Sequence, residues 1–241
     1  DNKIDFMTTE EFKTNIQEAL QAFAKGNLTK NSLDLFNKLG YVTERCAPLD
    51  KTTFDEFKDT YISDQRFDEA KARVKEWKYV DLLFQLSREE VSQQASLFDT
   101  KQVDKTIIET YLFFVLQLKG EDYNRTDLSN ITREINRLFP MPVMVFFKYG
   151  NKLTFSVINR RLHKRDETKD VLEKVTLIKD ISIETPLRAH IEILFDLSFN
   201  ELLSKHQFSN FVELHNAWQK TLDTKELNKR FYSELFNWYL W

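Results

Sequence analysis

The sequence predicts an α/β fold in which a mixed central sheet is flanked by helices and followed by an all-helical C-terminal segment. Two continuous apolar runs, residues 111–118 and 142–149, are typical of strands that are covered on both faces. Between them, residues 126–139 carry apolar side chains at helical spacing. No strand pattern returns after about residue 183. The chain therefore divides into a sheet-forming part and a helical part.

Two helices are expected before this core. Thr8 and the glutamate three residues later have the spacing of a capping box, and the helix that they open ends at Gly26. A second helix over residues 31–39 ends at a glycine, which readily adopts the left-handed conformation of a helix terminus. Residues 41–45 then form a short strand candidate. With 21 phenylalanines and only four glycines, the chain has many large side chains to bury and few flexible connectors.

The elements around the central block follow from similar patterns. Residues 53–78 predict helix, whereas residues 79–86 suit either a strand, which we favour, or a buried helical turn. Gly150 and Asn151 suit a two-residue hairpin turn, which leads into a further strand over residues 152–161. We therefore expect the sheet to contain both parallel and antiparallel neighbours.

We expect two parts in the chain, an α/β module over residues 1–183 and a helical connector over residues 184–241. Pro186 suits the first turn of a helix, and two more helical patterns follow it. The final residues, "FNWYLW", are apolar, whereas a natural terminus is usually polar and frayed. We therefore expect this sequence to be a piece of a longer protein that continues into another domain.

Composition narrows the function classes. The 35 basic and 38 acidic residues nearly balance, so a nucleic-acid surface would have to come from local clustering. Cys46 is the single cysteine, which excludes an intramolecular disulfide and a cysteine-rich zinc site and suits a reducing cytoplasm. No apolar run approaches the roughly 18 residues that span a bilayer, so no membrane partner is expected. Glycine-rich phosphate or cofactor loops, HExxH and GxSxG are all missing.

One strand end carries candidate chemistry. Gln117 and Lys119 are two residues apart, so on a strand their side chains leave the same face. A metal-dependent nuclease needs oxygen ligands for a hard cation and a lysine beside the scissile phosphate. The alternative is an ordinary strand that reaches solvent at this point. An acidic ligand would still be needed: Asp104 fits a compact hairpin better, and Asp81 fits the start of a strand better.

Basic residues near this strand end could hold DNA phosphates. The predicted helix carries Arg133 and Arg137 four residues apart, and Arg125 precedes its start. A second basic group surrounds His163, itself a candidate acid or base that more commonly would be a surface residue. The members of this second group are Arg160, Arg161, Lys164 and Arg165. The alternative for both groups is an ordinary solvated surface, because acidic residues follow the second group closely.

Long stretches of the chain resemble a known class of protein. They are "YLFFVLQLKGEDYNRTDLSNITREINRLFPMPVMVFFKYGNKLTFSVINRRLHKRDETKDVLEKVTLIKDI", "RAHIEILFDLS" and "ELHNAWQKTLDTKELNKRFYSELFNWYLW". These are similar to the region that precedes the catalytic domain in large bacterial adenine-specific restriction-modification methyltransferases. The resemblance covers residues 105–241 well and the first hundred loosely. It implies a front module of a bacterial defence protein, with methyltransferase and target-recognition domains following in the same chain. S-adenosylmethionine would bind only in that absent methyltransferase domain.

The resemblance also implies an activity. The front module of such proteins is often a PD-(D/E)XK nuclease, and its Mrr-like branch is similar in using Gln-x-Lys. A restriction-endonuclease-like fold that cuts double-stranded DNA with Mg²⁺ is therefore expected. Gln117 would be a metal ligand together with Asp104 or Asp81, and Lys119 would lie beside the phosphate. Neither Pro-Asp nor Gly-Asp precedes the predicted hairpin, so the acidic ligand stays open between these two. The alternative is a non-catalytic scaffold that binds DNA or docks the methyltransferase; a small-molecule enzyme is the least supported class.

Overall fold

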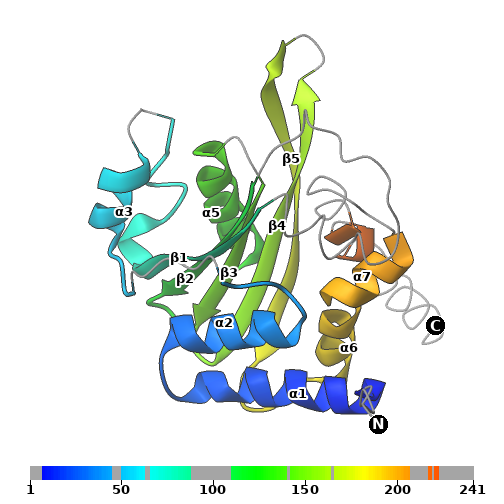
Figure 1. Ribbon diagram of the computed structural model, residues 1–241. Coiled ribbons are helices and arrows are strands. Elements are labelled where there is room, and N and C mark those ends of the chain that lie inside the picture. The colour runs from blue at the N-terminus through cyan, green and yellow to red at the C-terminus, as the bar shows by residue number, and fades with distance from the viewer. Residues whose placement is uncertain are drawn as a thin grey trace, which may run out of the picture.

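The computed structural model describes residues 7–44, 50–62, 66–87, 110–139, 142–163, 166–206, 217–218 and 220–222. Its centre is a mixed five-stranded sheet with helices on both faces, which confirms the predicted α/β class (Figure 1). The strands are adjacent in the order β1 (Trp77–Ser87), β2 (Thr110–Leu118), β3 (Val143–Tyr149), β4 (Lys152–His163) and β5 (Asp166–Ser182). Only β2 and β3 are parallel; the other neighbours are antiparallel.

Alternation along the central strands explains their continuous apolar sequences. In β2, Phe113 and Val115 belong to the core on one face, whereas Leu112 and Phe114 belong to the core on the other. The same alternation runs along β3, whose first five residues are fully buried. The prediction of strands covered on both faces is therefore confirmed.

One face of the sheet is covered by α1 (Thr9–Gln21), η1 (Ala22–Ala24), α2 (Leu28–Lys38), α6 (Arg188–Asp196) and α7 (Phe199–His206). Phe36 lies at the centre of this layer, where its ring contacts those of Tyr41, Phe84, Phe113, Phe146 and Phe155. The predicted capping box is confirmed, since Thr8 and Glu11 exchange hydrogen bonds of 2.9 and 3.2 Å.

Helical residues after the sheet share this same core. The Trp218 indole donates to the Tyr41 hydroxyl at 2.7 Å, and that hydroxyl donates to the carbonyl oxygen of Leu197, also at 2.7 Å. The described part of residues 184–241 thus packs directly on the sheet. That it leads on to a methyltransferase domain stays a prediction. No helix among the described residues is long and apolar enough to cross a membrane.

The opposite face is covered by α3 (Phe54–Tyr61), η2 (Val74–Glu76) and α5 (Arg125–Arg137). The predicted apolar stripe of α5 is confirmed, because Leu128, Ile131 and Ile135 are fully buried. Its N-cap is Asn124, whose side chain accepts the N–H of Asp127 at 2.8 Å. Arg125 is therefore the first residue of the helix and does not precede it.

Two local predictions differ from the structure. Among the described residues of 53–78, the α-helix covers only α3, and β1 already begins at Trp77. Most of the remainder is turns and η2, because the indole N–H of Trp77 donates to the carbonyl oxygen of Ala72 and holds this segment against β1. Residues 41–44 are not a strand; Tyr41 uses its hydroxyl in the helical layer. The hairpin turn at Gly150 is confirmed, and its φ of +51° favours glycine there.

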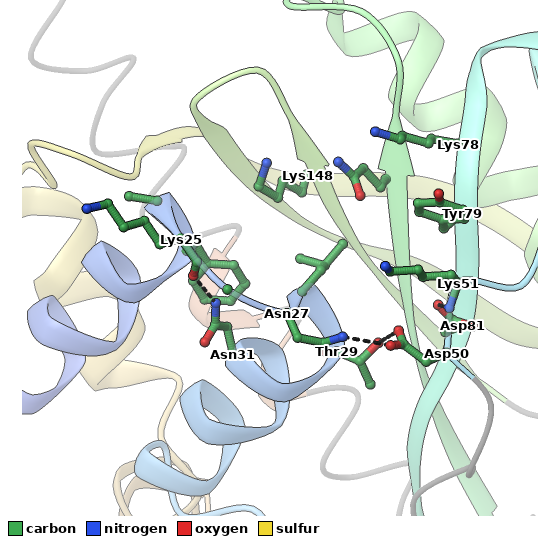
Figure 2. Close-up of a pocket in the computed structure, with 15 residues that line it drawn as sticks. Lys25, Asn27, Thr29, Asn31, Asp50, Lys51, Lys78, Tyr79, Asp81 and Lys148 are labelled. Carbon is green, nitrogen blue, oxygen red and sulfur yellow. Dashed lines mark hydrogen bonds between the residues drawn. The ribbon is translucent and has the colours of Figure 1, made fainter.

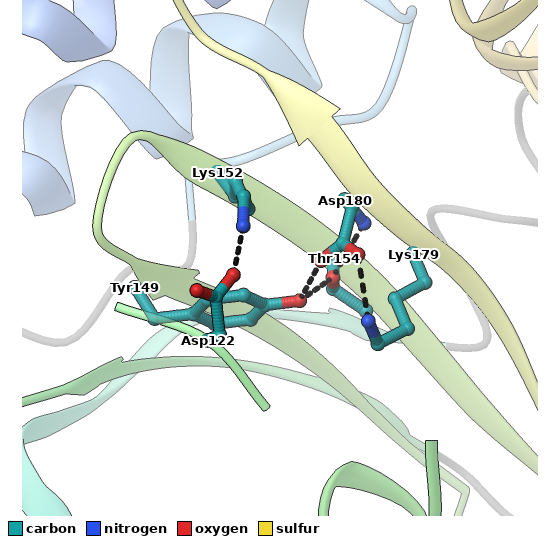
Figure 3. Close-up of polar contacts among 6 residues, drawn as sticks. All are labelled: Asp122, Tyr149, Lys152, Thr154, Lys179 and Asp180. Carbon is teal, nitrogen blue, oxygen red and sulfur yellow. Dashed lines mark hydrogen bonds and ion pairs between the residues drawn. The ribbon is translucent and has the colours of Figure 1, made fainter. Parts of the chain in front are cut away.

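Hydrogen bonds among Tyr149, Thr154 and Asp180, here called the polar lock, hold the β3–β4 hairpin against β5 (Figure 3). The buried Tyr149 hydroxyl donates to Asp180 at 2.6 Å and lies 2.7 Å from the Thr154 hydroxyl. Burial and then the bond to Asp180 raise the pKa of Tyr149. Asp180 sits at a bulge with φ of +61°, and Lys179 pairs with it at 2.6 Å. Because Tyr149 points to the α5 face, the preceding Lys148 points to the opposite face.

Candidate functional site

A pocket of about 480 Å³ lies where the parallel strands β2 and β3 end. Gln117 and Lys148 line it and are opposite each other in the β2–β3 register. One wall is the turn between η1 and α2, and the other is the start of β1 with residues 50–51 (Figure 2). In open α/β sheets, ligands bind outside the carboxyl ends of the strands, so this is the expected place for a site.

Strand alternation directs these side chains into the pocket. Gln117 follows Phe113 and Val115 on the face of β2 that carries α1 and α2. Lys148 likewise follows Met144 and Phe146 on the same face of β3. On this face, the side chains of both strands change from apolar to polar at the point where the helical layer ends and the pocket begins.

Four lysines line the pocket: Lys25 on one wall, Lys51 and Lys78 on the opposite wall, and Lys148 between them (Figure 2). Within the described residues none of the four pairs with a carboxylate. Burial, reinforced by the charge of Lys78, lowers the pKa of Lys148, although Glu121 opposes the shift. Positive charges that are held together without acidic partners create a potential that attracts anions.

Both carboxylates in the pocket lining accept hydrogen bonds from residues of the pocket walls. Asp81, which is only 5% exposed, accepts the backbone N–H groups of Lys51 and Thr52, each at 3.0 Å. Asp50 accepts from Asn27 at 2.6 Å and from the Thr29 hydroxyl at 2.9 Å. These bonds tie the segment at residues 50–52 to β1 and to the start of α2. Four lysines against two carboxylates leave two positive charges in excess.

The structure brings together two of the four predicted catalytic residues. Asp81 and Gln117 line the pocket, on antiparallel neighbours in which Gln117 is opposite Tyr79. Lys119 lies just beyond β2, outside the pocket lining, where its ammonium donates to the carbonyl oxygen of Lys75 at 2.9 Å. Lys148 instead is the lysine beside Gln117. Asp104 lies outside the described residues.

Those predicted DNA-contacting residues that the structure describes lie away from the pocket. Arg125, Arg133 and Arg137 belong to α5, which covers the other face of the sheet, and Arg137 pairs with Glu134 at 2.5 Å. Arg160 and Arg161 lie in the part of β4 that pairs with β5 but not with β3. This part extends beyond the rest of the sheet as a two-stranded ribbon (Figure 1). Lys164 and Arg165 lie outside the described residues.

A family model matches residues 84–235, which is more than half of the chain. The chain belongs to the DUF4391 family. This family is described as a domain of unknown function. No curated protein matches the chain, and neither does any solved structure. The DUF4391 match includes Gln117 and Lys148 but begins after all the other lining residues, so the family model covers the strand ends of the pocket and neither of its walls.

The described residues of this DUF4391 protein do not by themselves complete a magnesium site. Among them, no group of three or more His, Cys, Asp or Glu side chains could hold a metal ion. Of the two predicted acidic ligands, Asp81 is the one in the described residues, and both of its carboxylate oxygens already accept hydrogen bonds from backbone N–H groups. Hard divalent cations need several oxygen ligands, and one engaged carboxylate with one amide falls short.

Sequence analysis missed the pocket lysines. Lys148 could have been found, because it ends an apolar run just as Gln117 does, and a helix between two buried strands predicts that they are parallel neighbours. Their carboxyl ends then meet at one edge of the sheet. Lys25, Lys51 and Lys78 come from separate segments outside that unit, and only the folded chain shows that they converge.

Proposed function

We propose that this chain is a DNA-binding module of a restriction-modification methyltransferase, and that its lysine pocket holds a phosphate of double-stranded DNA. The observation that carries the proposal is the set of four lysines around Gln117, none of which pairs with a carboxylate among the described residues. Lysine ammonium groups bind phosphate oxygens as point charges. Such contacts provide most of the affinity of non-specific DNA binding.

The restriction-endonuclease-like form of the fold belongs to the same proposal. It is supported by the mixed sheet flanked by helices and by the resemblance of residues 105–241 to restriction-modification proteins. Sequence choice and methylation would belong to target-recognition and methyltransferase domains of the same chain, acting in the cytoplasm. The module itself would contribute contacts to the DNA backbone, which position a protein without selecting a sequence.

The test is equilibrium binding to a fluorescent duplex of about 20 base pairs at roughly 50 to 200 mM salt, where backbone contacts make affinity strongly salt-dependent. Replacing Lys78 and Lys148 by glutamine should weaken binding and reduce the salt slope by about two, because each lost phosphate contact lowers it by about one. Lys205→Gln is the matched control, since Lys205 lies on α7 and pairs with Asp196. Equal losses in the control and the double variant would refute the pocket as the binding site.

Phosphodiester cleavage is the second candidate function. It is favoured by one observation, that Asp81 and Gln117 share the pocket with Lys148. The assay is magnesium-dependent cutting of plasmid DNA by the natural full-length protein, with Gln117→Ala as the variant. Loss of cutting with retained DNA binding would support this candidate. If the plasmid stays intact while the wild-type protein is saturated with DNA, the cleavage function is excluded and only the binding function is left.

A further inference from the structure

We infer that the pocket prefers a phosphate monoester, as carried by the 5′ end of a DNA strand or by a free nucleotide, over the internal diester of the DNA backbone. The inference rests on the proposed function, because it concerns which phosphate of DNA the lysine pocket accepts. Three features support it: the excess charge of the lining, the donors at the start of α2, and the size of the pocket.

The charge of the lining suits a dianion. The four lysines exceed the two carboxylates by two positive charges, and both carboxylates are engaged in hydrogen bonds. An internal phosphodiester carries one negative charge, whereas a phosphate monoester carries about 1.5 to 2 at neutral pH. The monoester therefore matches the lining more closely and relieves more of the repulsion that Lys78 exerts on Lys148.

Backbone donors add to the lysines on one wall. Gly26, Asn27, Leu28 and Thr29 bring the first turn of α2 to the pocket. The Asn27 side chain accepts the N–H of Lys30 at 2.8 Å, but in the described part of the chain the N–H groups of Leu28 and Thr29 have no acceptor. Such N–H groups are well suited to phosphate oxygens. A monoester presents three terminal oxygens and can use both walls, while an internal diester presents only two.

The size of the pocket suits a terminal nucleotide. At about 480 Å³, the pocket has the size of small-molecule sites and exceeds what one phosphate fills. Tyr79 is also in the lining, with the Lys78 ammonium 5.7 Å from the centre of its ring. An aromatic ring beside a phosphate-binding lysine is a surface on which a terminal base would stack.

Asp50 provides a way to tune the same site. Its carboxylate bonds Asn27 and Thr29, so it places a negative charge at the start of α2, where a phosphate would bind. Asp50→Asn removes this charge and retains an oxygen that accepts hydrogen bonds. The substitution should therefore tighten monoester binding, which a simple loss of structure would not do.

The experiment compares 3′-labelled duplexes with a 5′ overhang that ends in either a phosphate or a hydroxyl group. We expect the phosphorylated end to bind roughly tenfold more tightly, in keeping with one additional charged hydrogen-bonding group. The Lys148→Gln variant should lose most of this preference, whereas Lys205→Gln should keep it. Asp50→Asn should tighten binding of the phosphorylated end only. Competition with dAMP, with deoxyadenosine as its control, distinguishes a free nucleotide from a strand end.

The outcomes separate this inference from the proposed function. Equal affinity for both ends, weakened in the Lys78 and Lys148 double variant, overturns the monoester preference and leaves DNA binding in place. Binding of dAMP without binding of either duplex supports the monoester and overturns the proposed function. Absence of binding to duplexes and to dAMP overturns both.

Discussion

Replacing Lys148 by methionine should stabilise the protein while weakening its binding to DNA. Lys148 is half-buried between Gln117 and the core, and burial together with the charge of Lys78 lowers its pKa. A lysine whose pKa is lowered on folding costs stability at all pH values below its folded pKa. Methionine keeps an unbranched chain of similar length and removes the charge. Under the proposed function, stability and DNA binding should therefore move in opposite directions.

The size of both effects follows from the surroundings of Lys148. Lys148 has no carboxylate partner among the described residues, and its ammonium donates to the carbonyl oxygen of Gly150 at 3.4 Å. Removing this partly buried charge should raise the free energy of unfolding by about 0.5 to 1 kcal/mol, within the range of single stabilising changes. For a domain of this size that raises Tm by about 1 to 4 °C. Losing one charged hydrogen bond to phosphate, worth about 1.5 to 3 kcal/mol, should weaken DNA binding about 10- to 150-fold.

The pH dependence gives a second readout of the same substitution. In wild type the unfolded chain holds the Lys148 proton more tightly than the folded protein, so wild-type stability should rise between the lowered folded pKa and the ordinary value of 10.5. The advantage of methionine should therefore shrink as the pH approaches 10.5. Thermal melts of Lys148→Met and of the control Lys205→Met, together with fluorescence anisotropy, measure all three quantities. A destabilised Lys148→Met protein with unchanged DNA affinity would refute the argument.

Three further substitutions test the site and the fold around it. In the same anisotropy assay, Lys119→Ala should weaken DNA binding at least about fivefold less than Lys148→Ala does, because the Lys119 ammonium bonds a backbone carbonyl outside the pocket. An equal loss of affinity in the two variants would support Lys119 as the phosphate-binding lysine. Tyr149→Phe removes two buried hydrogen bonds and should cost about 1 to 3 kcal/mol in urea unfolding, and an unchanged midpoint would mean that the polar lock contributes nothing. Asn136→Ala should lower the free energy of unfolding by about 2 to 4 kcal/mol, because it leaves the buried N–H and carbonyl groups of Val143 without their side-chain partner. A decrease below about 1 kcal/mol would contradict this reasoning.

The central part of the fold was predictable because its patterns are local. Two largely apolar strands around a helix with an apolar stripe specify a parallel pair, and Gly150 specifies the hairpin that follows. The segment over residues 53–78 was not predictable, because its charged and aromatic spacing suits a helix while the contacts of Trp77 at its end determine the structure. The indole of Trp77 bonds Ala72 and packs against Phe54 and Phe57, which fixes turns where local propensity favours a helix.

The candidate site was predictable only in the strand end that carries Gln117. Spacing placed Lys119 on the same face, but β2 ends at Leu118, and the N–H of Lys119 donates to Glu76 while its side chain turns to Lys75. The lysine beside Gln117 comes instead from the parallel neighbour β3, in register. The argument for Lys119 uses spacing of two residues along one strand, and it assumes that the strand continues that far. The argument for Lys148 uses the pairing of two strand ends, and it depends only on the helix that connects the two parallel strands. For this chain, the second kind of argument leads to Lys148, and the comparison of Lys119→Ala with Lys148→Ala tests which of the two lysines contacts phosphate.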